Sequence, residues 1–359
     1  MSIITIIGSG MMGSAMARPA KDNGHEIRLV GTPLDNAIIE AVKAGKDHPT
    51  LKRSFNGIAT AFYISELGEA LNGTDVVLAG ISSFGVDWFT ENILQVLPKN
   101  VPVLSITKGM RLEANDSLQV FPHHFASKRP DLDFIAVGGP CISFELFDRR
   151  QTMVYYCGRN MAAVKKVKSV FETSYYHIIP STDTVAVECS AALKNAYAMG
   201  VSLAVGLAER EKGVTDARGI TGNSIPGAPD LNPVYNPQAA LFAQSCLEMR
   251  RLVEMLGGNG DLVAGLPGAG DLYVTVFGGR TRRLGTLLGR GMNYSKVKEV
   301  LNGVTLEAVA IITRVAEFLR RASKAGKADL KKFPLMMHMD SILNKESPVA
   351  LDWESFGEL

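Results

Sequence analysis

The stretch that decides the fold is Ile3-Ile4-Thr5-Ile6-Ile7, followed by Gly8-Ser9-Gly10-Met11-Met12-Gly13 and Ser14-Ala15-Met16-Ala17. Residues 3–7 form an apolar run rich in β-branched side chains, which is typical of a parallel-sheet strand buried on both faces. The glycines that follow have G-x-G-x-x-G spacing, which suits a tight turn, the close approach of a pyrophosphate and the packing of the next helix. The stretch therefore predicts a dinucleotide-binding turn. The alternative is a tight strand-to-helix turn that binds nothing.

Length and composition restrict the class of protein. The chain has 359 residues, 46% hydrophobic and 21% charged, which fits a globular protein with two domains. A net charge of +2 gives no support for a nucleic-acid or membrane partner. The apolar runs predict no membrane-spanning segment and the N-terminus no signal peptide, so we expect a cytoplasmic protein. Scattered cysteines and histidines predict reduced thiols and no metal site.

Strands and helices alternate through the first half of the chain. After a helix that we expect to end near Gly24, strands are predicted at 26–30, 75–81, 102–106, 134–137 and 153–157. This alternation predicts a doubly wound α/β sheet over residues 1–182. The pattern changes near Asp183, and residues 183–359 are predicted to form a helical second domain.

The end of the second predicted strand leaves the choice of cofactor open. An acidic residue there would hold the ribose 2′-hydroxyl of NAD. The chain has Gly31-Thr32-Pro33 instead, with Asp35 slightly late, and no arginine replaces it to hold a 2′-phosphate. Use of either NAD or NADP is the resulting expectation.

Other predicted strands deliver polar residues to the edge of the sheet where ligands bind. Ser82 and Phe84 follow one strand, and Thr107-Lys108-Gly109 follows the next. Lys108 is placed to meet an anion or a reacting oxygen. The alternative is a solvated loop lysine, a common surface residue.

The helical half contains two polar residues in an apolar segment, Lys194 and Asn195. A buried lysine is costly unless it is paired or functional. The segment 208–236 is rich in Gly, Pro, Asn and Asp and is predicted to be a long loop or lid. Helical patterns resume at 239–256.

A further cluster of interest lies at residues 270–280. A helix starting at Asp271 would place Asp271 and Thr275 on one face. The run Gly278-Gly279-Arg280 would offer backbone amides and a guanidinium to a phosphate. A capped helix followed by a solvated basic turn explains the same residues.

Taken in order, these motifs resemble the NAD(P)-dependent glycerol-3-phosphate dehydrogenase family over nearly the whole chain, and its archaeal-type members most. The resemblance rests on the following ordered motifs: Gly8-Ser9-Gly10-Met11-Met12-Gly13, Gly31-Thr32, Gly45-x-x-His48-Pro49, Thr107-Lys108-Gly109, Ala192-Leu193-Lys194-Asn195, Gly270-Asp271-Leu272-x-x-Thr275 and Gly278-Gly279-Arg280. It implies a Rossmann-type domain, a helical domain and an active site in the cleft between them. It also implies hydride transfer between a nicotinamide and dihydroxyacetone phosphate or glycerol 3-phosphate, and a homodimer.

The resemblance implies a role for each matching residue. Lys194 would be the general acid/base, with Lys108 polarising the same oxygen and Asp271 completing the catalytic set. The residues implied to contact the substrate are Lys108, Asn195, Asp271, Thr275, Arg280 and Thr281. The residues implied to contact the cofactor are Gly8, Ser9, Gly10, Met11, Met12, Gly13, Thr32, Ser82, Phe84, Lys108, Cys141, Ser143, Arg280 and Glu307.

The chain also departs from the family pattern. Thr281 replaces a frequent asparagine, Cys141 a frequent serine or asparagine, and Gln238 a frequent lysine or arginine. We expect these positions to lie near the substrate. They leave open a larger phosphorylated polyol or ketose as substrate, or, in another class, a dinucleotide-binding protein without catalysis.

Overall fold

The computed structural model describes residues 1–220, 234–302, 304 and 306–357. The chain divides into two compact units. The N-terminal unit comprises Met1–Lys108 and Val120–Glu188, and the C-terminal unit comprises Gly109–Gln119 and Cys189–Leu359. The sequence placed a boundary between residues 182 and 183, just before a long helix, whereas the compact units divide inside that helix.

The N-terminal unit is built on an eight-stranded sheet in the order β10-β9-β8-β5-β4-β1-β2-β3. The strands are β1 (Ile3–Ile7), β2 (Glu26–Val30), β3 (Thr60–Phe62), β4 (Val76–Ala79), β5 (Val103–Ser105), β8 (Phe134–Gly138), β9 (Thr152–Cys157) and β10 (Tyr176–Ser181). Neighbouring strands are parallel except β8 and β9, which pair antiparallel with Val137 opposite Tyr156. The expected doubly wound sheet is thus confirmed from β3 to β8, and β9 and β10 extend it in the opposite direction.

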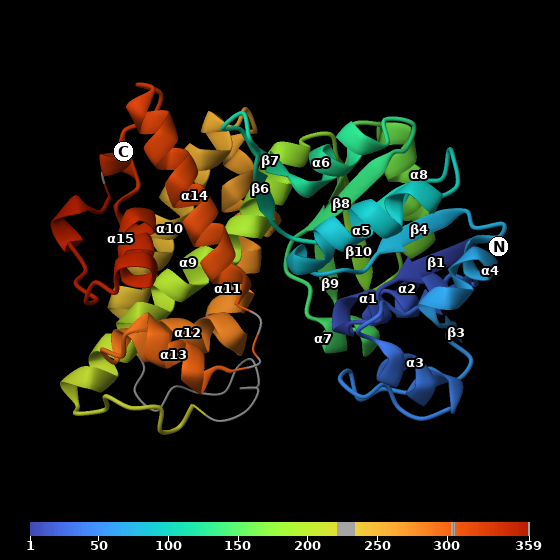
Figure 1. The fold of residues 1–359 in the computed structure, drawn as a ribbon, viewed down its shortest axis with the longest axis horizontal. Coiled ribbons are helices and arrows are strands. Elements are labelled where there is room, and N and C mark those ends of the chain that lie inside the picture. The colour runs from blue at the N-terminus through green and yellow to red at the C-terminus, as the bar shows by residue number, and fades with distance from the viewer. Residues whose placement is uncertain (221–233, 303, 305, 358–359) are drawn as a thin grey trace. The chain divides into compact units, whose positions relative to one another are not determined.

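Helices cover both faces of this sheet (Figure 1). They are α1 (Met11–Ala15), α2 (Ala17–Asp22), α3 (Asn36–Lys43), α4 (Leu67–Leu71), α5 (Val86–Asn92), α6 (Phe121–Lys128), α7 (Ser143–Phe147) and α8 (Met161–Phe171). Because side chains alternate along a strand, Ile6 packs into the core on one face and Ile7 into the core on the other. This double burial explains the unbroken apolar run of β1.

The helix after the glycine turn was predicted as one element, but it is two. The first ends at Ala15 and the second begins at Ala17. Pro19 lies four residues after Ala15 and has no N–H to donate to its carbonyl, so the helical ladder is interrupted there.

The C-terminal unit is mainly helical. Its helices are α9 (Thr184–Glu211, shared with the N-terminal unit), α10 (Tyr235–Met255), α11 (Asp271–Val276), α12 (Gly279–Gly289), α13 (Tyr294–Val300), α14 (Glu307–Lys324) and α15 (Pro334–Lys345). Residues 109–119 add the strand β6 (Met110–Leu112), which pairs with β7 (Leu118–Val120). Arg314 of α14 donates to the Met110 carbonyl at 2.9 Å and ties the hairpin to this unit. Strands of three residues carry too little periodicity to be predicted from sequence.

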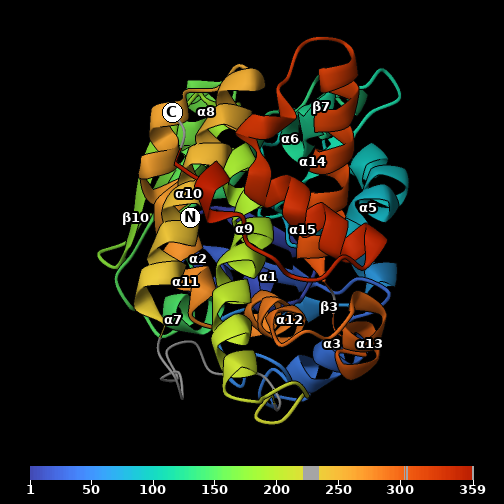
Figure 2. The same ribbon diagram turned by 90° about the vertical axis from the view of Figure 1, so that its left-hand side faces the viewer.

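The long helix α9 is the centre of the C-terminal unit (Figure 2). Its backbone approaches α12 so closely that a Cβ on Gly206 would lie 2.1 Å from the Thr286 carbonyl oxygen, and one on Gly285 2.3 Å from that of Met199. The helix is long and apolar enough to cross a membrane, but 78% of its most apolar window is buried in the protein. It is therefore a core helix.

The predicted loop 208–236 is shorter at both ends than expected. Helix α9 continues to Glu211, and α10 begins at Tyr235. Residues 221–233 of this predicted lid lie outside the described residues.

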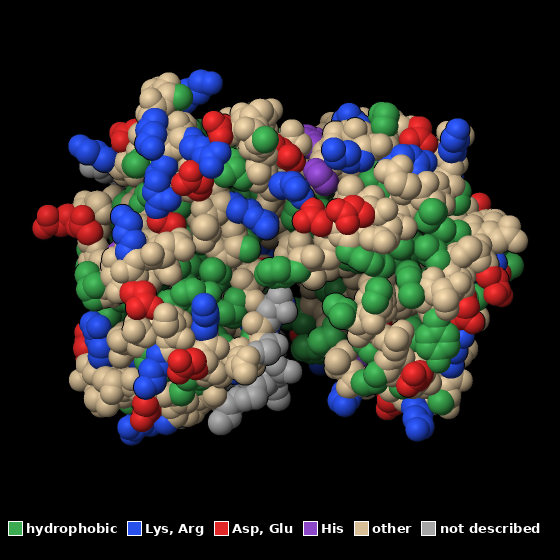
Figure 3. Space-filling view, viewed as in Figure 1, with side chains coloured by type: hydrophobic (Ala, Val, Ile, Leu, Met, Phe, Trp, Pro, Cys, Tyr) green, Lys and Arg blue, Asp and Glu red, His purple; other side chains and the backbone are tan. Residues whose placement is uncertain are grey.

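The surface carries both signs of charge. On the face in view in Figure 3, lysine and arginine side chains are interspersed with aspartate and glutamate. This agrees with the net charge of +2 and with the absence of a polyanion-binding signal in the sequence.

Candidate active site

The glycine turn has the geometry that a dinucleotide requires. Gly8 has φ +107, and a Cβ there would lie 2.5 Å from the Gly80 carbonyl oxygen. A Cβ on Gly13 would lie 2.3 Å from the Gly8 carbonyl oxygen, so these two positions need glycine to let strand, turn and helix approach. A Cβ on Gly10 would meet no atom within 4 Å. Packing within the protein therefore does not require a glycine at position 10. A pyrophosphate lying over this residue would require one.

A cavity of about 470 Å³ opens beside this turn within the N-terminal unit. It lies at the carboxyl ends of β1, β2 and β4, where the strand order reverses, the usual ligand site of such sheets. Thr32, Ser82 and Phe84, all predicted to contact the cofactor, are among its lining residues. The full lining is Gly8, Gly10, Thr32, Pro33, Leu34, Asp35, Gly80, Ile81, Ser82, Phe84, Gly85 and Trp88. The residues present thus fit the adenosine and pyrophosphate of NAD or NADP.

Cys141 and Ser143 lie just before and at the start of α7, the helix that packs against α1. The Cys141 thiol contacts the Met12 sulfur at 4.0 Å, and Ser143 is buried at the start of α7. Met11, by contrast, is 41% exposed. The sequence analysis gave Cys141 both a cofactor contact and a position near the substrate; in the structure its thiol contacts a residue of the glycine turn.

Lys108 follows β5 directly. The Thr107 hydroxyl beside it donates to the Ile81 carbonyl at 2.9 Å, which joins the ends of β5 and β4. Nearby lies Glu188, a residue the sequence analysis missed: it is 1% exposed and neither carboxyl oxygen has a hydrogen-bond partner. Burial raises the pKa of Glu188 to about 8, while the Lys108 cation opposes this rise. A single acidic residue in the apolar run 184–193 was the signal that could have revealed it.

Lys194 and Asp271 form an ion pair in the C-terminal unit. The Lys194 Nζ donates to Asp271 Oδ1 at 2.5 Å. The side chain of Asp271 is 0% exposed and that of Lys194 14% exposed. Asp271 is the first residue of α11, where the sequence predicted a helix to start, and Thr275 donates its hydroxyl to the Asp271 carbonyl at 2.7 Å. A buried carboxylate holds a neighbouring ammonium in its charged form and in a fixed position.

A second group of polar side chains adjoins this pair through the neighbouring residue Asn195. The Asn195 amide donates to Glu307 Oε2 at 3.3 Å, and the Arg280 guanidinium lies 4.0 Å from the same oxygen. Arg280 belongs to the first turn of α12 and its side chain is 49% exposed. Thr281, next in the same turn, is half-buried. The structure therefore gathers the predicted residues 194, 195, 271, 275, 280 and 307 within one unit.

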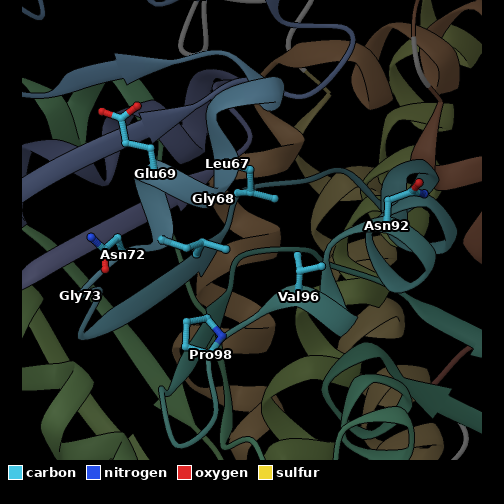
Figure 4. A pocket seen from close by; sticks show the side chains of 9 residues that line it. Leu67, Gly68, Glu69, Asn72, Gly73, Asn92, Val96 and Pro98 are labelled. Carbon is cyan, nitrogen blue, oxygen red and sulfur yellow. The ribbon is translucent and has the colours of Figure 1, made fainter.

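Other hollows carry less chemistry. A groove of about 780 Å³ in the N-terminal unit is lined by residues 67–69, 71–73, 92, 96 and 98. In Figure 4 the side chains of Leu67, Val96 and Pro98 surround it, while the Glu69 carboxylate points away. In the part of the chain that the structure describes, no cluster of three or more His, Cys, Asp or Glu could hold a metal ion.

Comparison with known families agrees with this geometry. The family model described as the N-terminus of NAD-dependent glycerol-3-phosphate dehydrogenase matches residues 3–164. The model described as the C-terminus of the same enzyme matches residues 183–351.

Individual relatives extend the same finding. The chain is 32% identical to an NADP(+)-dependent glycerol-3-phosphate dehydrogenase of Archaeoglobus fulgidus, over 92% of each chain. It is 27% identical to a glycerol-3-phosphate dehydrogenase [NAD(P)+] of Streptococcus agalactiae, over 87% of this chain and 85% of the relative. Among solved structures, that of glycerol-3-phosphate dehydrogenase from Coxiella burnetii has a TM-score of 0.77 at 21% identity, covering 97% and 96% of the two chains. That structural likeness concerns the fold.

Proposed function

Because this chain belongs to the NAD-dependent glycerol-3-phosphate dehydrogenase family, we propose that it interconverts dihydroxyacetone phosphate and sn-glycerol 3-phosphate with NAD or NADP. The observation that carries the proposal is the Lys194 ammonium held on the buried Asp271, in the same unit as Asn195, Glu307 and Arg280. A charged, anchored amine and an arginine able to bind phosphate, both in one unit, are the two cationic groups that reduction of a phosphorylated ketone would use.

The chemistry of the carbonyl assigns the role of Lys194. A bound reduced nicotinamide dinucleotide would supply the hydride for C2 of the ketone. As the carbon–oxygen π bond breaks, negative charge develops on oxygen, and a positioned ammonium stabilises that charge and donates the proton. In the reverse direction the neutral amine of Lys194 takes the proton from the hydroxyl.

Asp271 and Lys108 support this step in different ways. Asp271 is fully buried and keeps the Lys194 Nζ in place through the 2.5 Å hydrogen bond. Lys108 is proposed to polarise the same oxygen, because a second cation stabilises the developing alkoxide and lowers the cost of releasing a proton from Lys194. Burial raises the pKa of Glu188, close to Lys108, to about 8, so this carboxyl is mostly neutral at pH 7 and leaves the positive charge of Lys108 in place.

The substrate phosphate is proposed to bind Arg280. Its guanidinium is half-exposed and lies 4.0 Å from Glu307, a separation longer than a direct hydrogen bond. An arginine can bind a phosphate with two parallel hydrogen bonds, and the backbone N–H groups at the start of α12 add to the positive potential. Asn195, Thr275 and Thr281 are proposed to bind the hydroxyl and phosphate oxygens.

The cofactor is proposed to bind in the 470 Å³ cavity of the N-terminal unit. Gly10 and the first turn of α1 would face the pyrophosphate, and Thr32, Ser82 and Phe84 the adenosine half. Lys108, Cys141, Ser143, Arg280 and Glu307 remain proposed contacts of the nicotinamide half. We also propose that the chain forms a homodimer and lies in the cytoplasm. Light scattering of the purified chain measures the oligomeric state.

An initial-rate assay tests the proposal. Dihydroxyacetone phosphate is supplied with NADH or with NADPH, and oxidation is followed by nicotinamide absorbance. The expected result is turnover with dihydroxyacetone phosphate in preference to longer phosphorylated ketoses. Dinucleotide binding without turnover on any of these ketoses would overturn the proposal, and preference for a longer ketose would correct the substrate.

A further inference from the structure

We propose that His48 is a positioning residue for cofactor binding, whose ring holds the glycine turn in the conformation that receives the pyrophosphate. The inference rests on the proposed function, because it assigns a role toward the same dinucleotide. His48 belongs to the 44–59 segment that follows α3, distant in sequence from the turn, and it is 0% exposed.

The neighbours of the ring fix which nitrogen carries the proton. The backbone N–H of Leu51 lies 3.1 Å from Nδ1, and that of Thr50 3.3 Å. Both groups can only donate, so Nδ1 is the acceptor. Nε2 lies 2.9 Å from the Ser9 carbonyl oxygen, which can only accept, so Nε2 carries the hydrogen and donates it. The ring is therefore neutral, with one tautomer.

The target of this hydrogen bond is the centre of the glycine turn. Ser9 stands between Gly8 and Gly10, and its carbonyl also accepts from the Ser14 hydroxyl at 3.0 Å. That hydroxyl oxygen lies 3.0 Å from the His48 Nε2, so it shares the ring's hydrogen with the Ser9 carbonyl. On the other side of the residue, the Ser9 N–H donates to Asp35 Oδ2 at 3.1 Å. Both peptide groups of Ser9 are thus held by side chains from outside the turn.

This arrangement matters for binding because the turn is otherwise made of residues with wide conformational freedom. Glycines lose more backbone entropy than other residues when they are ordered. A turn that is already fixed by His48 leaves less ordering to be done when the cofactor binds, which raises affinity. Asp35 alone cannot fix the turn, because it binds only the N–H of Ser9, whereas the Ser9 carbonyl is held by His48 and Ser14.

Protonation of the ring would oppose this role. A proton on Nδ1 would face the N–H groups of Thr50 and Leu51, and burial already lowers the pKa of His48. The ring therefore stays in its neutral form at neutral pH. The ionisable group that acts on it is the Asp35 carboxylate, which weakly favours the cation.

Two amide substitutions, made in the full-length chain, test the roles of the two ring nitrogens separately. In His48→Gln, the amide nitrogen can reach the position of Nε2 and donate to Ser9. In His48→Asn, the shorter amide can replace the Nδ1 acceptor but cannot reach Ser9. Dissociation constants for NADH and NADPH are measured by nicotinamide fluorescence, together with kcat and the thermal midpoint of the cofactor-free protein. His124→Gln, at another buried histidine of the same unit, is the matched control.

The expected result is an approximately tenfold weaker Kd for both dinucleotides in His48→Asn, the size of one lost hydrogen bond. In His48→Gln and in the control, Kd for both dinucleotides should stay within about threefold of the wild-type value. In all three variants, kcat at saturating cofactor should change little. Equal Kd values for the two His48 variants would overturn the inference. If His48→Asn does not fold, the 15N chemical shifts of the wild-type His48 ring are measured instead: a protonated Nε2 and an unprotonated Nδ1 support the inference, and the opposite tautomer overturns it.

The same titrations keep this inference apart from the proposed function. A wild-type chain that binds no dinucleotide contradicts the proposed function itself. A wild-type chain that binds and reduces the ketone, with His48→Asn unaffected, contradicts only the role of His48.

Discussion

The glycine turn of the N-terminal unit and the Lys194 cluster of the C-terminal unit, the two proposed binding regions, are built by opposite means. The turn is a backbone structure. Gly8, Gly10 and Gly13 matter because they have no side chain, and hydrogen bonds from side chains such as His48 hold the turn in place. The cluster is built from ionised side chains around the fully buried Asp271.

This difference predicts two kinds of sensitivity. At the turn, one added methyl group changes the shape offered to a ligand while leaving every charge in place. In the cluster, removal of one charge leaves its partner buried without compensation, while the shape of the unit hardly changes. The expected effects of substitution follow from this contrast.

The largest expected effect is that of Lys194→Ala. Loss of the proton donor and of the partner of Asp271 should lower kcat by about 10³-fold or more, while Kd for the cofactor stays within about twofold. Steady-state rates and fluorescence titration measure the two quantities. Lys296→Ala, at an exposed lysine of α13, is the control. Wild-type turnover in Lys194→Ala would remove the assignment of this lysine.

Gly10→Ala tests the turn in the complementary way. The added methyl group meets no protein atom within 4 Å, so the thermal midpoint should be unchanged or slightly higher. The methyl group would occupy the space proposed for the pyrophosphate, so Kd for the cofactor should rise about tenfold to a hundredfold. Gly8→Ala should instead destabilise the protein, because its Cβ would lie 2.5 Å from the Gly80 carbonyl oxygen. Normal cofactor affinity in Gly10→Ala would contradict the placement of the pyrophosphate.

Arg280→Ala tests the phosphate end of the cluster. Loss of a charge-assisted hydrogen bond should raise KM for the phosphorylated substrate about tenfold to a hundredfold, with a smaller change in kcat. Arg250→Ala, at an exposed arginine of α10 paired with Glu254, should leave KM unchanged. An unaltered KM in Arg280→Ala would show that the phosphate binds elsewhere.

The last comparison concerns stability rather than catalysis and separates two buried glutamates. Glu188, in the N-terminal unit, has no hydrogen-bond partner and a pKa of about 8. Glu248 of α10 has a pKa of about 7 and accepts hydrogen bonds from Tyr197, Gln244 and the N–H groups of Leu335 and Met336. Glu248 therefore serves as a structural hydrogen-bond acceptor, whereas no hydrogen bond fixes the protonation state of Glu188.

Both raised pKa values make stability fall as pH rises above about 4.5, up to about pH 8 for Glu188 and about pH 7 for Glu248, so substitution is what distinguishes the two. Because its pKa is raised in the folded state, the Glu188 carboxyl stays protonated while the unfolded chain ionises above about pH 4.5. Stability should therefore fall as pH rises from 4.5 to 8, by about 1.4 kcal/mol per pH unit, and level off above 8. Glu188→Gln removes this slope, so its thermal midpoint should gain on wild type between pH 5 and 8. Glu248→Gln should be less stable at every pH, because its amide nitrogen would face backbone donors. If plots of thermal midpoint against pH were parallel for Glu188→Gln and wild type, they would contradict the burial of Glu188 without a hydrogen-bond partner.

Much of the fold followed from local pattern. The apolar run 3–7 and the glycine spacing predicted β1 and its turn, because steric limits on the backbone act between neighbours along the chain. The start of α11 at Asp271 and the strand at 26–30 were predicted for the same reason. The reversal of β9 and β10 and the hairpin at 110–120 were not, because strand direction and three-residue strands depend on distant partners.

By itself the sequence singled out the residues that are proposed to carry chemistry: the glycines of the turn, Lys194 in an apolar helix and Arg280 at a helix start. Only the tertiary structure decided how they are held. It brought Glu307 to Asn195 across 112 positions of the chain and set His48 against the Ser9 carbonyl across 39. Residue type and local spacing fix what a side chain can do, whereas its neighbours, burial and charge state depend on contacts that no short stretch of sequence contains.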